Sequence, residues 1–523
     1  MIYTTKDARH IIVPWHDALA QLVPHARDYT YQDQRLLVLP NEHAEAKLAR
    51  NLGIPVPSPI LTRYDWRGQK PWDIQRTTSA LLTENERAYV LSTMGTGKTR
   101  AALFAADYMR TVGAITRVLV VAPLSTLTPV WESEMWHTMP RWRVRVLHGS
   151  KAKRLQLLRE DADCYVINHH GVELLKDELI ARQFDVIIID ELAVFRNKST
   201  GLWKALNALV NAPGTRYVWG MTGSPTPSAP TDAWAQVRML TPGRTVRTMR
   251  QFQDITMKKV SDFRWVPRPE ANDIVHQAMQ PAVRFTREDV MELPETIYLD
   301  RSVTLDPETA QAYKLLHDKM RTMVATGENI TAANEGVLCG KLLQVSAGYV
   351  YTDKGTVYEL PNTKRLAALE EIVNETEPER KIIVFVNFIH ALEGVALHLK
   401  RAGHTVEVVY GKTSRSQRDA IFSKFQNETD PRIIVAHPQC MSHGLTLTAA
   451  NTIIWYNPTQ SLETYEQANA RITRPGQTSK TLIAHMVGTT VEKLVYQRLK
   501  QRGKQQGVLL DLFKNQTMEN DNG

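Results

Sequence analysis

Short apolar runs recur along two long stretches of the chain, and each run is followed by an amphipathic segment. In the first stretch, about residues 70–245, the runs are rich in β-branched residues and continuously apolar. This pattern predicts parallel strands buried on both faces. The predicted strands are 87–92, 117–122, 143–147, 164–168, 184–190 and 216–222. Helical segments between them, such as 98–110, predict a doubly wound α/β domain.

The same rhythm returns near residue 363. The predicted strands there are 381–386, 404–410, 432–437, 451–456 and 480–487. We therefore predict an α/β protein with two doubly wound parallel-sheet lobes, 66–245 and 363–510, and a mostly helical insertion, 246–362. A small N-terminal preface, 1–65, and a flexible polar tail, 511–523, complete the chain. Within the preface, residues 35–40 predict a short strand and residues 43–53 a helix.

Charge and cysteine content narrow the class of protein. Lys and Arg number 64 and Asp and Glu 55, giving a net charge of +9. Such an excess suits a polyanionic partner such as nucleic acid, and a merely solubilising basic surface is the alternative. Three scattered cysteines favour neither a disulfide framework nor a zinc cluster, so we expect a cytoplasmic protein. No apolar run approaches the roughly 20 residues of a membrane helix, so we expect no membrane association.

A Gly-rich segment, STMGTGKT at residues 92–99, lies between a predicted strand and a predicted helix. Its glycines let backbone N–H groups face phosphate oxygens, and the helix N-terminus adds a positive dipole end. Lys98 is expected to reach the β- and γ-phosphates and Thr99 to hold Mg²⁺. The residues expected around the nucleotide are Met94, Gly95, Thr96, Gly97, Lys98 and Thr99.

An acidic pair, Asp190-Glu191, ends the predicted strand 184–190. Ligands bind at this end of parallel strands. We expect Asp190 to hold Mg²⁺ through water and Glu191 to orient the attacking water as a general base. A solvated loop pair is the alternative, but the upstream Gly-rich segment favours catalysis. Thr222 and Ser224, which follow another strand, could sense the γ-phosphate.

In the second lobe, Gln467, Arg471 and Arg474 are spaced at i, i+4 and i+7, which predicts one shared helical face. Two arginines and a glutamine suit a triphosphate. A solvated basic face is the alternative. Because this lobe has no second phosphate loop in its sequence, we predict that its arginines complete the site of the first lobe.

With these motifs in this order, from about residue 70 to 505, the chain resembles the superfamily II helicase-like ATPases, and most closely the SWI/SNF-type DNA translocases. The matching segments are 94–99, 120–140, 147–150, 187–197, 221–227, 381–388, 442–450 and 467–477. By this resemblance Gln75 is the adenine-reading glutamine. The chain departs from the pattern at Ala193, Met441, Ser442 and Thr446, none of which replaces a catalytic group.

The resemblance implies two RecA-like lobes that clamp double-stranded DNA and close on ATP. It implies DNA-dependent ATP hydrolysis that moves the protein along the duplex without processive unwinding. Backbone amides and small hydroxyls would contact phosphates without reading sequence. The expected DNA contacts are Pro123, Ser125, His148, Gly149, Thr222, Asn387, His437 and Ser442.

Two alternatives to a duplex translocase stay open. One is a helicase that separates or anneals strands on branched DNA. The other is a nucleotide-gated DNA clamp without catalysis, against which the presence of Lys98, Glu191, Arg471 and Arg474 argues. The compact length resembles bacterial and phage proteins of this type. The sequence alone does not name protein partners.

Overall fold

The computed structural model describes residues 2–66, 70–261, 264–286, 289, 294–325, 332–351, 356–441, 447–474 and 476–504. These residues divide into two compact units. The first unit holds those of 1–256 and 269–290, and the second holds those of 257–268 and 291–508.

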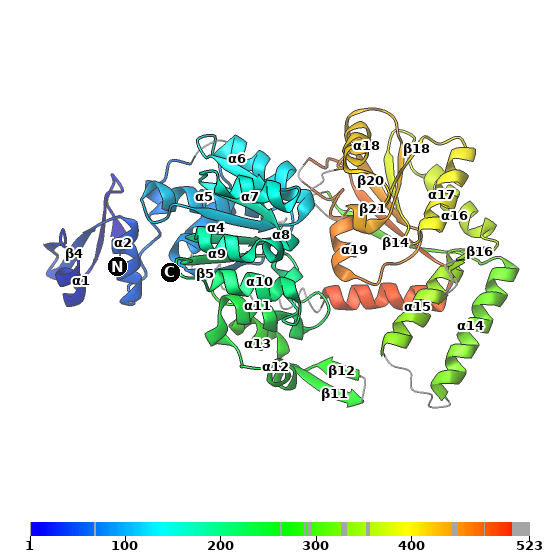
Figure 1. Cartoon of the computed structure of the whole chain (residues 1–523), viewed down its shortest axis with the longest axis horizontal. Coiled ribbons are helices and arrows are strands. Elements are labelled where there is room, and N and C mark those ends of the chain that lie inside the picture. Colours follow the sequence, from blue (N-terminus) through cyan, green and yellow to red (C-terminus); the bar gives the residue numbers. More distant parts are fainter. Residues whose placement is uncertain are drawn as a thin grey trace. The chain divides into compact units, whose positions relative to one another are not determined.

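The N-terminal part of the first unit is a small antiparallel sheet with its own core. Its strand order is β1-β2-β4-β3. Alternate residues of β2 and β4 are buried against α1 and α2, which gives the sheet one buried face (Figure 1). The strand predicted at 35–40 and the helix predicted at 43–53 are both confirmed. The bounds are β1 (Tyr3–Thr4), β2 (His10–Pro14), α1 (Asp17–Leu22), β3 (Arg27–Tyr31), β4 (Gln34–Pro40), α2 (His43–Asn51) and α3 (Ile60–Arg63).

The rest of the first unit is built on a seven-stranded sheet of order β13-β5-β10-β9-β6-β8-β7, and every neighbouring pair is parallel. All six predicted strands are present. The bounds are β5 (Arg87–Val90), β6 (Val118–Ala122), β7 (Val144–Leu147), β8 (Cys164–Asn168), β9 (Val186–Asp190), β10 (Tyr217–Met221) and β13 (Ala282–Val283).

Both faces of this sheet are buried, because alternate strand residues enter two separate cores. In β9, Ile187 and Ile189 belong to one core and Val186 and Ile188 to the other. Complete burial of such a side chain contributes about 1.5–3 kcal/mol, so the strand ends are held by a tightly packed interior. One face packs on α4 (Asp73–Glu84), α5 (Lys98–Thr111) and α6 (Ser133–Thr138). The other packs on α7 (Lys151–Arg159), α8 (His169–Leu174), α9 (Lys176–Arg182), α10 (Gly201–Val210), α11 (Ala233–Leu240), α12 (Met249–Thr256) and α13 (Ala271–Ala278).

The second unit repeats this plan with a six-stranded parallel sheet of order β14-β21-β20-β17-β19-β18. The five predicted strands are confirmed as β17 (Lys381–Phe385), β18 (Val406–Val409), β19 (Ile433–Ala436), β20 (Ala450–Trp455) and β21 (Thr481–Val487). One face packs on α16 (Thr363–Glu375) and α17 (Ile389–Arg401), and the other on α18 (Arg415–Asn427), α19 (Leu462–Asn469) and a helix at 490–504. The predicted fold class of two doubly wound lobes is therefore confirmed.

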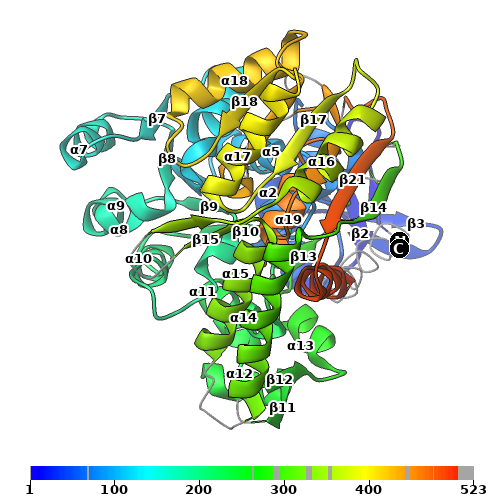
Figure 2. The same cartoon turned by 90° about the vertical axis from the view of Figure 1, so that its right-hand side faces the viewer.

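The predicted helical insertion contains helices but also supplies strands. Within the second unit, α14 (Pro307–Ala325) and α15 (Ala332–Ser346) lie side by side (Figure 2). Two hairpins, β11 (Met257–Ser261) with β12 (Arg264–Pro267) and β15 (Tyr349–Tyr351) with β16 (Val357–Glu359), were not predicted. Nor were the edge strands β13 and β14 (Thr296–Ser302), because β13 has two residues and β14 is mostly exposed, with only three apolar residues in a row.

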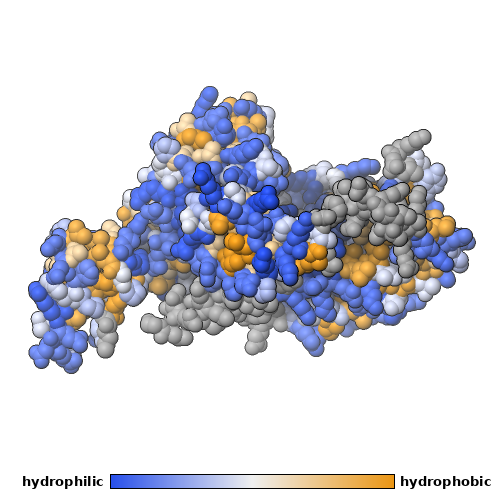
Figure 3. Space-filling model, turned by 90° about the horizontal axis from the view of Figure 1, so that it is seen from below, coloured by the Kyte–Doolittle hydropathy of each residue, from blue (hydrophilic) through white to orange (hydrophobic). Residues whose placement is uncertain are grey.

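The visible surface is mostly hydrophilic, with its apolar residues in separate patches (Figure 3). None of the helices in the described ranges combines the length and apolar character needed to span a bilayer. Cys164, Cys339 and Cys440 are free thiols.

Candidate functional site

The Gly-rich segment joins the end of β5 to the start of α5, as predicted. Gly95 has a φ of +89° and Gly97 a φ of +73°. Side chains with a Cβ rarely adopt this left-handed conformation, so glycine is required at both turns. Helix α5 begins at Lys98, so the N–H groups of its first turn face the loop. This arrangement forms the cradle that binds phosphates at helix N-termini.

Two side chains lie across the loop. Lys98 Nζ donates to the carbonyl oxygen of Ser92 at 2.6 Å, so its ammonium spans the turn. Gln75 Nε2 donates to the carbonyl oxygen of Gly97 at 3.4 Å, and Gln75 Oε1 accepts from the backbone N–H of Trp72 at 2.9 Å. A Cβ on Gly97 would lie 2.1 Å from Gln75 Nε2, which is a second reason for glycine there. The structure therefore brings together Gln75 and the loop.

Asp190 ends β9, and two residues that the sequence analysis did not single out hold it in place. Trp131 Nε1 donates to Asp190 Oδ2 at 3.0 Å, and His169 Nε2 donates to the Asp190 carbonyl oxygen at 2.9 Å. Burial raises the pKa of the Asp190 carboxyl, while Lys98 and the Trp131 hydrogen bond oppose this shift. Burial also lowers the pKa of His169 to about 4, so its ring is neutral near pH 7. The Asp190 carboxylate is thus desolvated, fixed in orientation and close to a cation.

Glu191 has a left-handed backbone with a φ of +56°. This conformation is uncommon for a residue with a long side chain, and such strain is concentrated at functional sites. It makes a sharp turn immediately after the strand, before the short helix Leu192–Phe195. Side chains along β9 alternate between the two faces of the sheet, and the turn at Glu191 ends this alternation.

The turn that contains Thr222 lies beside the phosphate loop. Strand order places β10 between β5 and β9, so their three carboxyl ends are neighbours. A Cβ on Gly223 would lie 3.6 Å from the Ser92 carbonyl oxygen and 3.9 Å from Lys98 Nζ. Ser224 N donates to Thr222 Oγ1 at 3.2 Å. Thr222 is buried, so its hydroxyl organises this turn.

The other predicted DNA contacts of the first unit follow β6 and β7, at the same edge of the sheet. Pro123 is buried, and its carbonyl oxygen accepts from Thr126 Oγ1 at 2.9 Å. Ser125 Oγ is buried and has no hydrogen-bond partner among the residues that the structure describes. His148 is exposed, and Gly149 has a φ of +105°. These four residues therefore occupy the carboxyl edge, where His148 and Gly149 are exposed and Pro123 is buried.

In the second unit, Asn387 follows β17 and pairs with Asn457, which follows β20. Asn387 Nδ2 donates to the Asn457 carbonyl oxygen at 3.0 Å, and Asn387 N donates to Asn457 Oδ1 at 3.1 Å. His437 follows β19, and burial lowers its pKa. Asn457, which is fully buried, was missed because a lone Asn-Pro reads as a turn. Ser442 and Thr446 lie outside the described residues.

The prediction that Gln467, Arg471 and Arg474 share a helical face is wrong. Helix α19 ends at Asn469, and both arginines follow it in turns. The cause is local competition for carbonyl groups. Arg471 Nε donates a hydrogen bond to the Gln467 carbonyl oxygen at 2.9 Å, and Arg474 Nε donates one to the Ala470 carbonyl oxygen at 3.0 Å. These are the acceptors that a continuing helix would have used.

Gln467, Arg471 and Arg474 differ in how far they are buried, and this difference limits the role that each can have. Arg471 is completely buried and Gln467 is 7% exposed, whereas Arg474 is partly exposed. Gln477 Nε2 donates to the carbonyl oxygens of Ala450 and Ile472 at 2.8 and 3.1 Å, which fixes the segment after α19. Arg474 is therefore the more exposed of the two arginines, and Arg471 is enclosed in the core.

The chain matches two family descriptions. Residues 81–344 match the SNF2-related domain, and residues 364–476 match the helicase conserved C-terminal domain. The first match covers the phosphate loop and the acidic pair, and the second covers Asn387, His437 and the arginines.

Several curated proteins are similar. An uncharacterized ATP-dependent helicase of Mycoplasma pneumoniae is 26% identical over 80% of this chain, which spans 39% of that protein. Putative protein p41 of Acyrthosiphon pisum secondary endosymbiont phage 1 is 26% identical over 83% of this chain and 96% of its own length. The SWI/SNF-related matrix-associated actin-dependent regulator of chromatin subfamily A-like protein 1 of Drosophila melanogaster is 22% identical over 80% of this chain, which spans 53% of that protein.

Among solved structures, the Sulfolobus solfataricus SWI2/SNF2 ATPase core in complex with dsDNA aligns with a TM-score of 0.41 and 22% identity. The alignment covers 87% of this chain and 96% of that one.

Proposed function

Because this chain belongs to the SNF2-related family of ATP-dependent, helicase-like enzymes, we propose that it is a motor that uses ATP hydrolysis to move along double-stranded DNA. One observation carries the proposal. The phosphate loop with Lys98, the pair Asp190-Glu191 and the Thr222 turn lie at the adjacent ends of β5, β9 and β10. An ammonium, a desolvated carboxylate and a second carboxylate within one strand edge are the groups that triphosphate hydrolysis requires.

The first unit supplies the binding of ATP in this proposal. The N–H groups at the start of α5 and the Lys98 ammonium hold the phosphates, and Gln75 hydrogen-bonds the adenine. Glu191 takes the role of the base that orients the attacking water. The left-handed turn at Glu191 supports this role, because Glu191 directly follows β9 and its side chain no longer follows the alternation between the two faces of the sheet.

The residues present also fit Mg²⁺. The Thr99 hydroxyl and the Asp190 carboxylate are hard oxygen donors of the kind that Mg²⁺ prefers, and a cation would stabilise the charge of the partly buried Asp190. Bound there, Mg²⁺ would offset the charge of the phosphates. The roles of Trp131 and His169 are to keep the Asp190 carboxylate and backbone oriented.

Arg474 and Arg471 have different proposed roles. Arg474, the partly exposed one, provides the finger that stabilises charge on the transferring phosphoryl group. Arg471, fully buried, positions the segment that carries Arg474. The planar guanidinium matters for the finger, because it can bind two phosphate oxygens at once.

The DNA partner is proposed from the family and from the net charge of +9. His148, the Gly149 turn, Ser125 and Pro123 at the edge of the first sheet, and Asn387 and His437 in the second unit, are the proposed contacts. The second candidate, a helicase that separates or anneals strands on branched DNA, shares this machinery.

The test is the steady-state ATPase rate with no nucleic acid, single-stranded DNA, duplex DNA, forked DNA and RNA in parallel. Duplex DNA should stimulate hydrolysis most, and the stimulation should weaken as salt rises, since phosphate contacts release counterions. Greater stimulation by single strands or forks would favour the helicase candidate. Nucleotide binding without turnover on any of these would support the non-catalytic clamp instead.

A further inference from the structure

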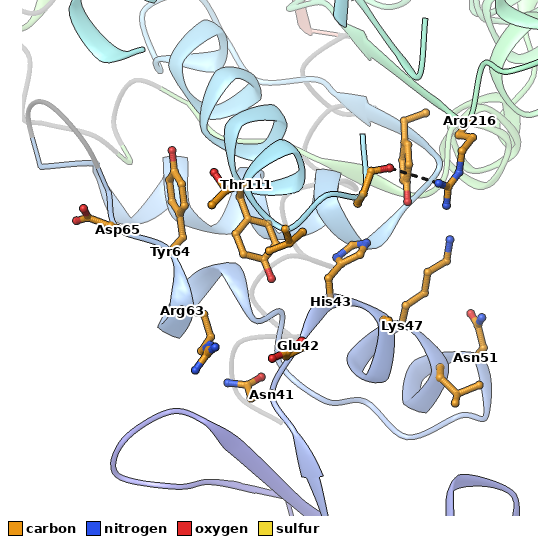
Figure 4. A pocket seen from close by; sticks show the side chains of 16 residues that line it. Asn41, Glu42, His43, Lys47, Asn51, Arg63, Tyr64, Asp65, Thr111 and Arg216 are labelled. Atoms are coloured by element: carbon orange, nitrogen blue, oxygen red, sulfur yellow. Dashed lines mark hydrogen bonds between the residues drawn. The ribbon is translucent and has the colours of Figure 1, made fainter. Parts of the chain in front are cut away.

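A pocket of about 730 Å³ lies in the first unit, away from the phosphate loop. It is bounded by α2 of the N-terminal sheet domain, by the last turn of α5 and by the start of β10 (Figure 4). Helix α5 has 14 residues, with Lys98 at its first position. Because an α-helix rises about 1.5 Å per residue, the pocket is about 20 Å from Lys98. It is therefore a separate site.

Two side chains of the pocket carry buried polar atoms that are unsatisfied. Tyr217 is 1% exposed, and its hydroxyl has no hydrogen-bond partner within the described ranges of the chain. The same holds for both ring nitrogens of His43. A buried polar group left unpaired costs about 1–3 kcal/mol, so native proteins rarely keep three of them together without a reason. A ligand that donates and accepts hydrogen bonds would satisfy them.

The pocket is also cationic on the side where these groups lie. Figure 4 shows His43, Lys47 and Arg216 on the same side of the pocket, while Asp65 points away from them. Burial, Arg50, Lys47 and Arg216 lower the pKa of His43 to about 4. His43 is therefore neutral near pH 7, with one nitrogen as donor and the other as acceptor.

Lys47 and Arg216 each donate a hydrogen bond to another residue of the protein. Lys47 Nζ donates to Glu86 Oε1 at 2.8 Å, and Arg216 Nη1 donates to the Ala114 carbonyl oxygen at 3.3 Å. Both side chains have further donors with which to bind an anion.

Aromatic rings line the same space. The rings of His43 and Tyr108 meet edge to face at 6.2 Å. The Arg216 guanidinium carbon lies 5.5 Å from the centre of the Tyr217 ring, and Lys47 Nζ lies 5.7 Å from it. Aromatic walls suit a flat ring, and adjacent cations suit a phosphate attached to it.

We propose that this pocket binds a nucleoside phosphate, either as a free nucleotide or as the terminal nucleotide of a strand. Arg216 and Lys47 bind the phosphate. The Tyr217 hydroxyl and the His43 ring nitrogens hydrogen-bond the polar edge of the base, and Tyr108 packs against its ring. The volume is within the range of about 300–1,000 Å³ typical of small-molecule sites.

The test is calorimetric titration of the full chain carrying Lys98→Ala, which weakens binding at the phosphate loop. The titrants are AMP, GMP, CMP, UMP, ribose 5-phosphate and a 5′-phosphorylated single strand. At least one nucleotide or the strand should bind at one site per chain, with a dissociation constant on the order of 10 μM. Saturation by a mononucleotide identifies a free nucleotide, and saturation by the strand alone identifies a strand end.

The matched variants are Tyr217→Phe and Tyr456→Phe, since both hydroxyls are buried and unpartnered in the described residues but only Tyr217 lines the pocket. Tyr217→Phe should weaken binding about tenfold and Arg216→Met by tenfold or more, while Tyr456→Phe leaves it unchanged. Equal loss in both tyrosine variants, no saturable binding, or binding of ribose 5-phosphate as tight as that of any nucleotide would overturn the proposal.

Discussion

The two parallel sheets have the same plan but different chemistry at their carboxyl ends. The first sheet has a glycine loop with Lys98 and the acidic pair at 190–191. The corresponding ends of β17 and β20 in the second sheet have the amides Asn387 and Asn457, and Asn387 donates two hydrogen bonds to Asn457. A shared fold therefore does not give a shared function, because function depends on the side chains placed on the strand ends.

The two units also differ in what neutralises a carboxylate in each. In the second unit, Arg365 and Glu492 are both buried, and Arg365 Nη2 lies 2.7 Å from Glu492 Oε1. Glu492 also accepts from Ser346 Oγ at 3.1 Å and from Gly488 N at 2.8 Å. This charge is satisfied within the protein and ties α15, α16 and the helix at 490–504 together. In the first unit, the partly buried carboxylate of Asp190 instead lies close to Lys98 of the phosphate loop.

The largest expected effect comes from removing one partner of the buried Arg365–Glu492 ion pair. Arg365→Met leaves Glu492 buried without its counter-charge, and this should destabilise the second unit by about 3–5 kcal/mol. Hydrogen exchange of the β17, β19 and β20 amides should accelerate by a factor on the order of 10²–10⁴, with little change in the first sheet. The double variant Arg365→Met/Glu492→Leu should recover most of the protection. If the single variant exchanges like the wild type, the pair does not stabilise this unit.

The proposed arginine finger gives the next effect. Arg474→Ala should lower the DNA-stimulated ATPase plateau by about 10³-fold, while ATP affinity stays nearly unchanged, because the first unit binds the nucleotide. Arg474→Lys should not rescue the rate, since an ammonium lacks the planar fork. The measurement is ATPase rate against DNA concentration. A curve shifted to higher DNA concentration with the same plateau would indicate a basic DNA-binding face instead.

The edges of the two sheets can be compared directly by substitution. Glu191→Gln and Lys98→Ala should each reduce turnover by at least about 10²-fold, whereas Asn387→Ala at the second sheet should reduce it far less. Glu191→Gln should still bind ATP, and Lys98→Ala should bind it more weakly. Single-turnover rates and equilibrium nucleotide binding provide the two readouts. Near-normal hydrolysis by Glu191→Gln would contradict its assignment as the base.

A smaller effect is expected from removing the hydrogen bond between Trp131 and Asp190. Trp131→Phe removes the indole hydrogen bond that lowers the pKa of Asp190, so this pKa should rise further above its ordinary value. Activity that needs the carboxylate is lost as pH falls through that pKa. The acid limb of the kcat/KM profile should therefore move to higher pH, with the rate loss largest at acid pH and smallest at alkaline pH. An unshifted acid limb would show that Trp131 has only a packing role.

Much of the fold was predictable because the central strands are continuously apolar. All eleven strands predicted in the two lobes are present, since burial on both faces leaves a strong signal. The edge strand β13 was missed because two residues are too short to give a pattern, and β14 was missed because its exposure removes that signal. The hairpin β11–β12 was missed because its exposed residues carry no apolar alternation.

The candidate site was predictable only where its residues are close in sequence. The loop at 92–99 and the acidic pair each form a local motif. Trp131 and His169 contact Asp190 from segments 59 and 21 residues away. Although Trp131 lies in the matching segment 120–140, no local pattern shows that either residue contacts Asp190. The helix-face prediction for Arg471 and Arg474 failed because spacing alone does not show that arginine side chains will take the backbone acceptors.

The central claim is ATP-driven movement along duplex DNA, and a triplex displacement assay tests it most directly. A third strand bound to a duplex should be displaced by the wild-type protein with ATP, and not by Lys98→Ala or without ATP. The two strands of the plain duplex should stay paired. ATP hydrolysis without third-strand displacement, or separation of the duplex strands themselves, would contradict the account.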